Sequence, residues 1–216
     1  MPGPVLVTGG AGFIGSHLVE RLLEEGHEVH VVDDLSTGCL ENLRAVRAHP
    51  RLHITVGSVL NYPMLNKVMG QVREALEGVD AVMHLAAESH VDRSIMGDTP
   101  FRTNVLGTQT MLAATLDARV RRFLHCSTDE VYGELPWRDP AAPGGGRFTE
   151  DAPLRPRSPY SASKAGSDHL ALAYHSTHGF DVAVTRCSNN YRPYQFPEKL
   201  IPLYVTNALE GRSLPA

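Results

Sequence analysis

The chain has 216 residues, is 42% hydrophobic and carries a formal net charge of −4. This length fits one large domain, or one domain and part of another, and the apolar content is sufficient for a buried core. The acidic excess is small and no long block of one sign occurs. This argues against nucleic acid as the main partner, because phosphate binding needs a basic face.

Three widely spaced cysteines, Cys39, Cys126 and Cys187, indicate a reduced, cytoplasmic setting. Neither they nor the eleven histidines show the short spacing typical of metal ligands, so the sequence predicts no metal site. No apolar run reaches the length of a membrane span, and residues 1–4 lead directly into a strand pattern. We therefore expect no membrane segment and no signal peptide.

Short valine-rich runs alternate with longer segments of helical periodicity. The runs predict strands at residues 5–7, 29–32, 52–56, 81–85, 123–126 and 182–185. Their nearly continuous apolar character is typical of strands buried on both faces of a parallel sheet. Ile14, Leu18 and Leu22 repeat at helical spacing and should face that sheet. The alternation predicts an α/β fold, a Rossmann-type doubly wound parallel sheet, with a surface loop at the Pro- and Gly-rich residues 136–146.

The first predicted strand runs into a glycine triplet, Gly9, Gly12 and Gly15, and a helical pattern follows. Residues without a Cβ let the backbone approach a pyrophosphate, and the N–H groups at the start of the helix then bind that anion. The second strand ends in Asp33, about 20 residues further on, where a carboxylate binds the hydroxyls of an adenosine ribose. A carboxylate there repels a 2′-phosphate, so the pattern predicts NAD rather than NADP.

Tyr160 and Lys164 stand four residues apart, so on a helix they share one face. A phenol with a pKa of ~10 is a weak base at neutral pH, and a neighbouring ammonium should lower that pKa. Thr128, Asp129 and Glu130 follow the fifth predicted strand. Because the carboxyl ends of strands line the ligand crevice of such a sheet, Thr128 should lie beside Tyr160. The two acids can supply the acid and the base that a dehydration needs.

The glycine loop together with Tyr160 and Lys164 resembles the extended short-chain dehydrogenase/reductase superfamily. Longer stretches resemble dTDP-glucose 4,6-dehydratases in particular, namely residues 86–95, 103–108, 127–133, 158–164, 187–191 and 196–202. The Thr-Asp-Glu triplet at 128–130 is the most specific of these, since sugar epimerases of the superfamily lack the Asp-Glu pair. The resemblance covers nearly the whole chain.

This resemblance implies conversion of dTDP-glucose to dTDP-4-keto-6-deoxyglucose with NAD as an internal redox cofactor. Tyr160 would take the proton of the sugar 4-hydroxyl, Glu130 would remove the C5 proton, and Asp129 would protonate the departing 6-hydroxyl. Thr128 and Lys164 complete the catalytic set. The predicted cofactor contacts are Gly9, Gly12, Phe13, Ile14, Gly15, Asp33, Ser58, Leu85, Ala86, Ala87, Thr103, Tyr160, Lys164 and Asn190. The implied substrate contacts are Ser89, Thr128, Asn189, Glu198 and Lys199.

The chain departs from this family at three points. Ser58 replaces an acid that follows the third strand near the adenine, so that contact is weaker or replaced. Arg192 replaces a glycine, which strains the backbone if its φ is positive. Family members also extend well beyond this length, so we predict an NAD-binding Rossmann domain at residues 1–190 and only the start of a substrate-binding lobe at 191–216. The likeness further predicts a homodimer in the full-length form.

Two other interpretations stay open. One is a different nucleotide-sugar enzyme, such as a 4-epimerase or a UDP-glucuronate decarboxylase, against which Asp129 and Glu130 argue. The other is an NAD-binding fragment without catalytic activity, which the short length and Arg192 favour.

Overall fold

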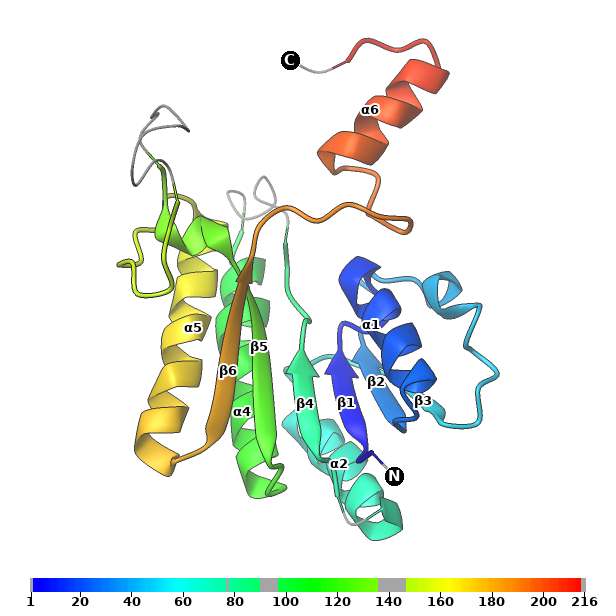
Figure 1. Cartoon of the computed structure of the whole chain (residues 1–216), viewed down its shortest axis with the longest axis vertical. Coiled ribbons are helices and arrows are strands. Elements are labelled where there is room, and N and C mark those ends of the chain that lie inside the picture. Colours follow the sequence, from blue (N-terminus) through cyan, green and yellow to red (C-terminus); the bar gives the residue numbers. More distant parts are fainter. Residues whose placement is uncertain (1, 77, 90–96, 136–146, 215–216) are drawn as a thin grey trace.

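Six parallel strands form one sheet at the centre of the structure (Figure 1). The structure is a computed structural model that describes residues 2–76, 78–89, 97–135 and 147–214. The sheet order is β3-β2-β1-β4-β5-β6, and every neighbouring pair is parallel. The strands are β1 Val5–Thr8, β2 Val29–Asp33, β3 Leu52–Val56, β4 Ala81–His84, β5 Arg122–Thr128 and β6 Asp181–Cys187. The predicted Rossmann-type sheet is confirmed.

Helices cover the sheet in two layers, with α2, α4 and α5 on one face and α1 on the other. The longer helices are α1 Phe13–Glu24, α2 Tyr62–Leu76, α4 Thr108–Asp117, α5 Pro159–His178 and α6 Leu200–Leu209. The described residues also form two 3-10 turns, η1 Leu40–Leu43 and η3 Asp129–Tyr132, and a π-helical segment, η2 Phe101–Gly107. The strand order changes direction between β1 and β4, and in such sheets a ligand crevice opens there at the carboxyl ends of the strands.

Two hydrophobic clusters bind these layers to the sheet. On the first face, Leu6 and Phe123 of the strands pack with Leu112 of α4. On the second face, Val31 packs with Val19 of α1. All five side chains are at most 1% exposed, so each layer is anchored by fully buried apolar groups.

The sheet-facing side of α1 differs from the prediction. Leu22 is buried and Leu18 half-buried, but Ile14 is 40% exposed, and Gly15 and Val19 are buried instead. A Cβ on Gly15 would lie only 2.0 Å from a carbonyl oxygen of the preceding loop. The helix therefore packs against the glycine loop through a residue without a side chain, which hydrophobic periodicity does not register.

The edge strand β6 is not buried on both faces, contrary to the prediction. Val182 and Val184 pack against the first cluster, whereas Asp181, Ala183 and Thr185 are exposed on the opposite face. The second cluster, beneath α1, extends across the sheet only as far as the residues of β4 and the loop that follows it. Among the described residues, β5 and β6 are therefore covered by helices on one face of the sheet.

Helix α6 stands apart from the sheet, above the carboxyl ends of the strands (Figure 1). Its apolar side chains are exposed to solvent, by 66% at Leu200, 53% at Val205 and 83% at Leu209. The predicted surface loop at 136–146 lies outside the described residues. Within the part of the chain that the structure describes, no helix is long and apolar enough to span a membrane.

Candidate active site

The loop between β1 and α1 surrounds the open N-terminus of α1. Gly9 has a φ of +70°, and a Cβ there would lie 2.8 Å from the amide nitrogen of Ala86. Gly12 precedes the helix without a side-chain cap. The first N–H groups of a helix, here those of Phe13 and Ile14, have no intrahelical acceptor. This arrangement can hold a pyrophosphate on backbone amides at the positive end of the helix dipole.

Asp33 lies beside this loop at the end of β2. Its carboxylate accepts hydrogen bonds from the backbone N–H groups of Ala11 and Leu35, each at 2.9 Å. Burial raises the pKa of Asp33, and these two bonds oppose the rise. A carboxylate has about four lone-pair sites, so the fixed side chain keeps acceptor capacity for ribose hydroxyls.

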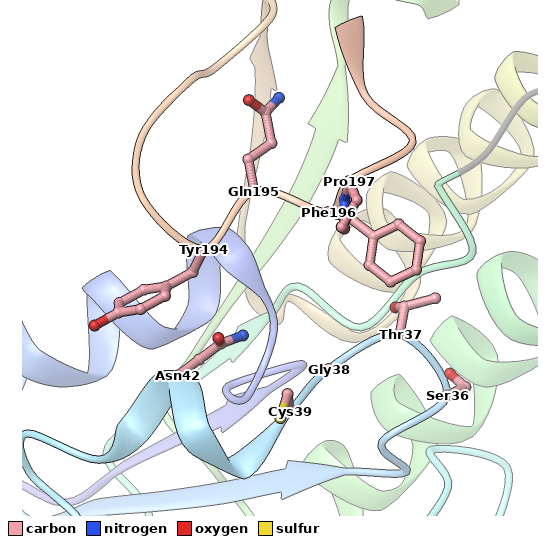
Figure 2. Close-up of a pocket in the computed structure, with 9 residues that line it drawn as sticks. All are labelled: Ser36, Thr37, Gly38, Cys39, Asn42, Tyr194, Gln195, Phe196 and Pro197. Carbon is pink, nitrogen blue, oxygen red and sulfur yellow. The ribbon is translucent and has the colours of Figure 1, made fainter. Parts of the chain in front are cut away.

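A cavity of about 360 Å³ opens between the loop after β2 and residues 194–197 (Figure 2). Figure 2 shows Tyr194 above Asn42 on the left and Phe196 above Thr37 on the right. Gly38 also lines the cavity, and a Cβ on it would lie 2.8 Å from Oδ1 of Asp33. The cavity therefore adjoins the carboxylate at which a dinucleotide ribose would bind.

The chain after β4 forms the opposite wall of the glycine loop. Leu85 donates its N–H to the carbonyl oxygen of Thr8 at 3.2 Å, and Ala86 donates to Oγ1 of Thr8 at 3.2 Å. Ala87 follows and is half-buried. The structure thus brings the predicted cofactor residues 85–87 directly against the glycine loop.

Asn104, to which the sequence analysis gave no role, connects this wall to α5. Its side chain accepts the N–H of Glu88 at 2.8 Å and donates to the carbonyl oxygen of Glu88 at 3.0 Å and to Oγ of Ser163 at 2.9 Å. Asn104 is 1% exposed and lies in the π-helical segment η2, next to the half-buried Thr103. Segments of this kind often mark functional sites, but only coordinates reveal them.

Ser58 and Asn190, two further predicted cofactor residues, make local hydrogen bonds. The hydroxyl of Ser58 accepts the N–H of Leu60 at 3.2 Å, so it stabilises a turn after β3. Asn190 is exposed after β6 and donates to the carbonyl oxygen of Ser188 at 2.9 Å.

A capping box fixes the start of α5 immediately before Tyr160. Oγ of Ser158 accepts the N–H of Ser161 and Oγ of Ser161 accepts the N–H of Ser158, both at 3.0 Å, with Pro159 at the helix start. Tyr160 is 8% and Lys164 3% exposed. Both side chains therefore lie on the buried face of one helix, as their spacing predicts.

The pKa of Tyr160 lies above its ordinary value, so the expected fall is wrong for this structure. Burial is the main cause, the negative charge of Glu130 adds to it, and a hydrogen bond with Thr128 opposes it. The ammonium of Lys164 donates to the carbonyl oxygen of Cys126 at 2.7 Å, and burial lowers its pKa. The spacing placed Tyr160 and Lys164 on one face, but it could not show that the ammonium binds a strand carbonyl.

The Thr-Asp-Glu triplet spans the end of β5 and the start of η3. Thr128 is 9% exposed, accepts the N–H of Glu130 at 3.3 Å and is hydrogen-bonded to Tyr160. Burial and the charge of Asp129 raise the pKa of Glu130. Tyr160 and the triplet thus form one site in which the groups perturb each other electrostatically, as expected for acid–base chemistry.

A buried ionic network holds η3 against α5 and β6. Arg186 donates from Nε to Oδ2 of Asp168 at 2.9 Å and from Nη1 to Oη of Tyr132 at 3.0 Å. Burial of Asp168 is outweighed by the nearby polar groups of His125 and Ser127 and by the hydrogen bond from Arg186, so its pKa is lowered. Tyr132 ends the turn that carries the acid pair, so Arg186 fixes that turn. Sequence analysis missed this network because its members are far apart in the chain.

Among the predicted substrate residues, Lys199 reaches the same site. Its ammonium donates to the carbonyl oxygen of Ser89 at 3.0 Å, and its charge opposes the rise in the pKa of Glu130. Asn189 and Glu198 are exposed in the segment that follows β6. The structure therefore gathers Ser89, Lys199 and Glu130, and leaves Asn189 and Glu198 facing solvent.

Arg192 does not have a positive φ, so the condition for backbone strain at this position is not met. The left-handed residue of this segment is Tyr194, with a φ of 73°. Its ring stacks on His17 of α1 at 5.7 Å, and His17 also bonds to the carbonyl oxygen of Pro193 at 3.0 Å. The segment after β6 is thereby attached to α1.

Cys126 and Cys187 lie on neighbouring strands next to the tyrosine of α5. The parallel register pairs Cys126 with Thr185, and the two sulfur atoms lie 4.0 and 3.7 Å from the same carbonyl oxygen, that of Ser127. A hydrogen bond between the thiols lowers the pKa of Cys187 to about 6 and raises that of Cys126. Their wide spacing in the sequence concealed this pair.

The Rossmann-type sheet, the glycine loop and the Tyr-x-x-x-Lys helix beside it define an extended short-chain dehydrogenase/reductase. More narrowly, the chain belongs to the GDP-mannose 4,6 dehydratase family, whose profile matches residues 6–215. It is 51% identical to the dTDP-glucose 4,6-dehydratase of Streptomyces griseus over 217 residues, which are 98% of this chain and 61% of that relative.

Solved structures agree with this placement. A double mutant of DesIV, a dTDP-glucose 4,6-dehydratase from Streptomyces venezuelae with NAD and DAU bound, matches with a TM-score of 0.88 at 51% identity. The match covers 98% of this chain and 63% of that one. The UDP-glucose 4-epimerase of Thermus thermophilus in complex with NAD matches with a TM-score of 0.84 at 33% identity, over 97% and 63%. The resemblance to dTDP-glucose 4,6-dehydratases is confirmed, and this chain spans less than two thirds of the length of these relatives.

Proposed function

We propose that this chain is the NAD-binding part of a dTDP-glucose 4,6-dehydratase, which forms dTDP-4-keto-6-deoxyglucose by loss of water. The observation that carries the proposal is the acid pair Asp129 and Glu130 on η3, next to Tyr160. A 4-epimerase eliminates nothing and has no need of a second acid there. The higher identity to dehydratases than to the epimerase, 51% against 33%, supports the same choice.

The residues present fit NAD. Neither Gly9 nor Gly15 has room for a Cβ, so their backbone forms a cradle for a pyrophosphate, and Asp33 disfavours a 2′-phosphate. Leu85, Ala86, Ala87 and Thr103 would form the wall of the same site. When bound, NAD⁺ would supply a positive charge and a group that accepts the hydride from C4 of the sugar and returns it to C6.

The side chains of this protein would then move the protons. Because burial raises the pKa of Tyr160, its phenol needs nearby positive charge before it can take the proton of the 4-hydroxyl. Thr128 would orient that hydroxyl. Glu130 would remove the C5 proton, which the adjacent ketone makes acidic, and protonated Asp129 would deliver a proton to the 6-hydroxyl as it leaves as water.

Residues 1–190 would be the NAD-binding domain and 191–216 the start of the substrate lobe, with Ser89, Asn189, Glu198 and Lys199 on the substrate side. A homodimer of the full-length form would use η2, α4 and α5. Exposed apolar side chains on these elements, such as Leu106 (50%) and Leu172 (42%), support this surface.

Calorimetric titration tests the cofactor assignment. The chain should bind NAD more tightly than NADP, and Asp33→Asn should reduce that preference. Equal or tighter binding of NADP by the parent chain would contradict the role given to Asp33.

The reaction is tested with the chain extended by the carboxyl-terminal lobe of the Streptomyces griseus relative, to which dTDP-glucose and UDP-glucose are offered. A product lighter by one water supports a dehydratase, and an isomeric product from UDP-glucose would show an epimerase.

A further inference from the structure

Three potential metal ligands converge towards the amino-terminal ends of the strands, away from the glycine loop. His30 on β2 and His53 on the edge strand β3 occupy partner positions in the parallel register. Partner residues project from the same face of a sheet. Glu28 lies just before β2, and one possible ligand atom of each residue lies within 4.8 Å of the other two.

The distances from Glu28 to the two histidines are close to those between the ligands of a metal ion. Nε2 of His30 and Nε2 of His53 lie 3.2 and 3.0 Å from the same oxygen, Oε1 of Glu28. In a tetrahedral zinc site with bonds of roughly 2.0–2.1 Å, ligand atoms are roughly 3.3 Å apart. The imidazole rings are stacked at 4.5 Å with an interplanar angle of 16°, and the Nε2 atoms of both rings lie beside the same carboxylate oxygen.

We propose that Glu28, His30 and His53 bind a divalent transition metal of the Zn²⁺ type, with water as the fourth ligand. Imidazole and carboxylate are common zinc ligands. The side chain of His53 is 49% exposed, against 14% for His30 and 24% for Glu28, so one side of the cluster is open to an entering ion.

Such an ion would cross-link the edge strand β3 to β2. The sequence analysis predicted no metal because it considered only ligands close together in the chain. The parallel register pairs His30 of β2 with His53 of β3, and the spacing of these residues in the sequence does not reveal this pairing. Hydrogen bonds from both imidazoles to Glu28 give similar distances, so the binding of the ion itself is the quantity to measure.

The test uses the untagged 216-residue chain, ZnCl₂ for calorimetry and thermal denaturation, and CoCl₂ for visible spectroscopy. We expect one saturable Zn²⁺ site, a rise in Tm on its occupation, and the intense visible absorption of tetrahedral Co²⁺. His53→Val and His30→Val should lose all three signals, because valine suits a strand but offers no ligand. His169→Ala, which removes an exposed histidine of α5, should retain them.

Glu28→Gln keeps the size of the side chain and serves if the histidine variants do not fold. It should remain folded and bind Zn²⁺ at least several-fold more weakly, because it loses the anionic ligand. The proposal is overturned if the parent chain shows no saturable site or no tetrahedral Co²⁺ spectrum. It is equally overturned if His169→Ala abolishes the signals as fully as His53→Val, since the ion would then bind elsewhere.

Discussion

Glu130 and Asp129 are adjacent carboxyl groups for which the proposed reaction requires opposite protonation states. Burial and the charge of Asp129 raise the pKa of Glu130, and the charge of Lys199 opposes that rise. Two acids in one small site do not ionise independently, so the environment of each carboxyl decides its role. The net rise makes ionised Glu130 a stronger base, and the ammonium of Lys199 limits that rise.

Glu130→Gln should block elimination but spare part of the first oxidation, because Glu130 acts only after the ketone has formed. In the chain extended by a substrate lobe, we expect turnover to fall by about 10²–10⁴-fold, the usual contribution of a general base. Solvent deuterium incorporation at C5 and transient NADH absorbance measure the two steps separately. The matched control is Glu134→Gln, an exposed carboxylate paired with Arg157. Dehydration at the parental rate in Glu130→Gln would exclude Glu130 as the base.

Cys187 should be the most readily alkylated thiol of the chain at weakly acidic pH. Its pKa of about 6 results mainly from the hydrogen bond with Cys126, and the thiolate is the reactive form. Pulsed iodoacetamide labelling, followed by mass spectrometry, should show its rate rising through a pH of about 6, with the exposed Cys39 as internal reference. Cys126→Val removes the thiol donor and should shift this midpoint upwards. An unchanged midpoint in that variant would refute the assigned cause.

Short sequence patterns predicted the strands and motifs of this fold, whereas contacts between distant segments could not be predicted. All six strands could be predicted because strands of a parallel sheet are almost continuously apolar. The glycine loop and the Tyr160 helix were equally visible, since their chemistry depends on short spacings. The bonds of Asn104 to Glu88 and of Arg186 to Asp168 join distant segments and leave no periodic signal. The direction of the pKa shift at Tyr160 depends on burial, which spacing does not describe.

A buried hydrogen-bond chain joins the strands beneath the cofactor loop to α4. Thr108 donates its only hydroxyl proton to the carbonyl oxygen of Asn104 at 2.6 Å, so it must accept from Nε2–H of His84 at 3.0 Å. Nδ1 of His84 then accepts from the hydroxyl of Thr8 at 2.7 Å, which in turn accepts the N–H of Ala86. This order assigns His84 as the neutral Nε2–H tautomer, in agreement with its strongly lowered pKa, which burial causes.

His84→Leu should destabilise the protein, because it leaves the hydroxyls of Thr8 and Thr108 without their buried partner. We expect a loss of about 1–3 kcal/mol in the free energy of unfolding, the cost of unsatisfied buried polar groups. Urea denaturation with an unchanged m value measures it. Thr110→Val removes a hydrogen bond of the more exposed side of α4 and should change stability by less than about 0.5 kcal/mol. Similar losses in both variants would show that the network adds nothing specific.

Two histidines that are buried in the described part of the chain, His84 and His125, make the stability of the protein depend on pH. Burial lowers the pKa of His84 well below its ordinary value and that of His125 to about 4. An unfolded histidine has a pKa of about 6.5, so below that pH the unfolded chain binds more protons than the folded one. The stabilisation is therefore present above a pH of about 6.5 and is lost as the pH falls towards 4. Asp168, whose pKa is also lowered, weakens the fold only at still lower pH.

The expected loss at a pH of about 5 is on the order of 2 kcal/mol for His125 alone. Urea denaturation at neutral pH and at a pH of about 5 measures it. His125→Gln retains an N–H donor towards Ser167 but cannot titrate, so its stability should fall less between the two conditions. An equal fall in the parent and in His125→Gln would refute the assignment of this pH dependence to His125.

The 216 residues should bind the cofactor but lack part of what the proposed reaction needs. The glycine loop, Asp33 and the wall at residues 85–87 are packed against the sheet, so the chain should bind NAD. The chemistry also needs the sugar held within about 3–3.5 Å of the nicotinamide. The region matched in the Streptomyces griseus relative is only 61% of that protein. Helix α6 meanwhile leaves Leu200 and Leu209 in solvent, which indicates a surface that another segment would cover.

We therefore expect the chain to bind NAD, to bind a dye for exposed apolar surface, and to convert dTDP-glucose at a negligible rate. A chimera that adds the carboxyl-terminal lobe of that relative should lose the dye signal and gain turnover, because the lobe would cover α6 and exclude water from the site. Arg192→Gly should change the chimera little, since the φ of Arg192 is not positive. Full activity of the 216-residue chain would refute the need for a lobe. Activity only in the glycine variant would show that Arg192 obstructs the site by its side chain rather than by backbone strain.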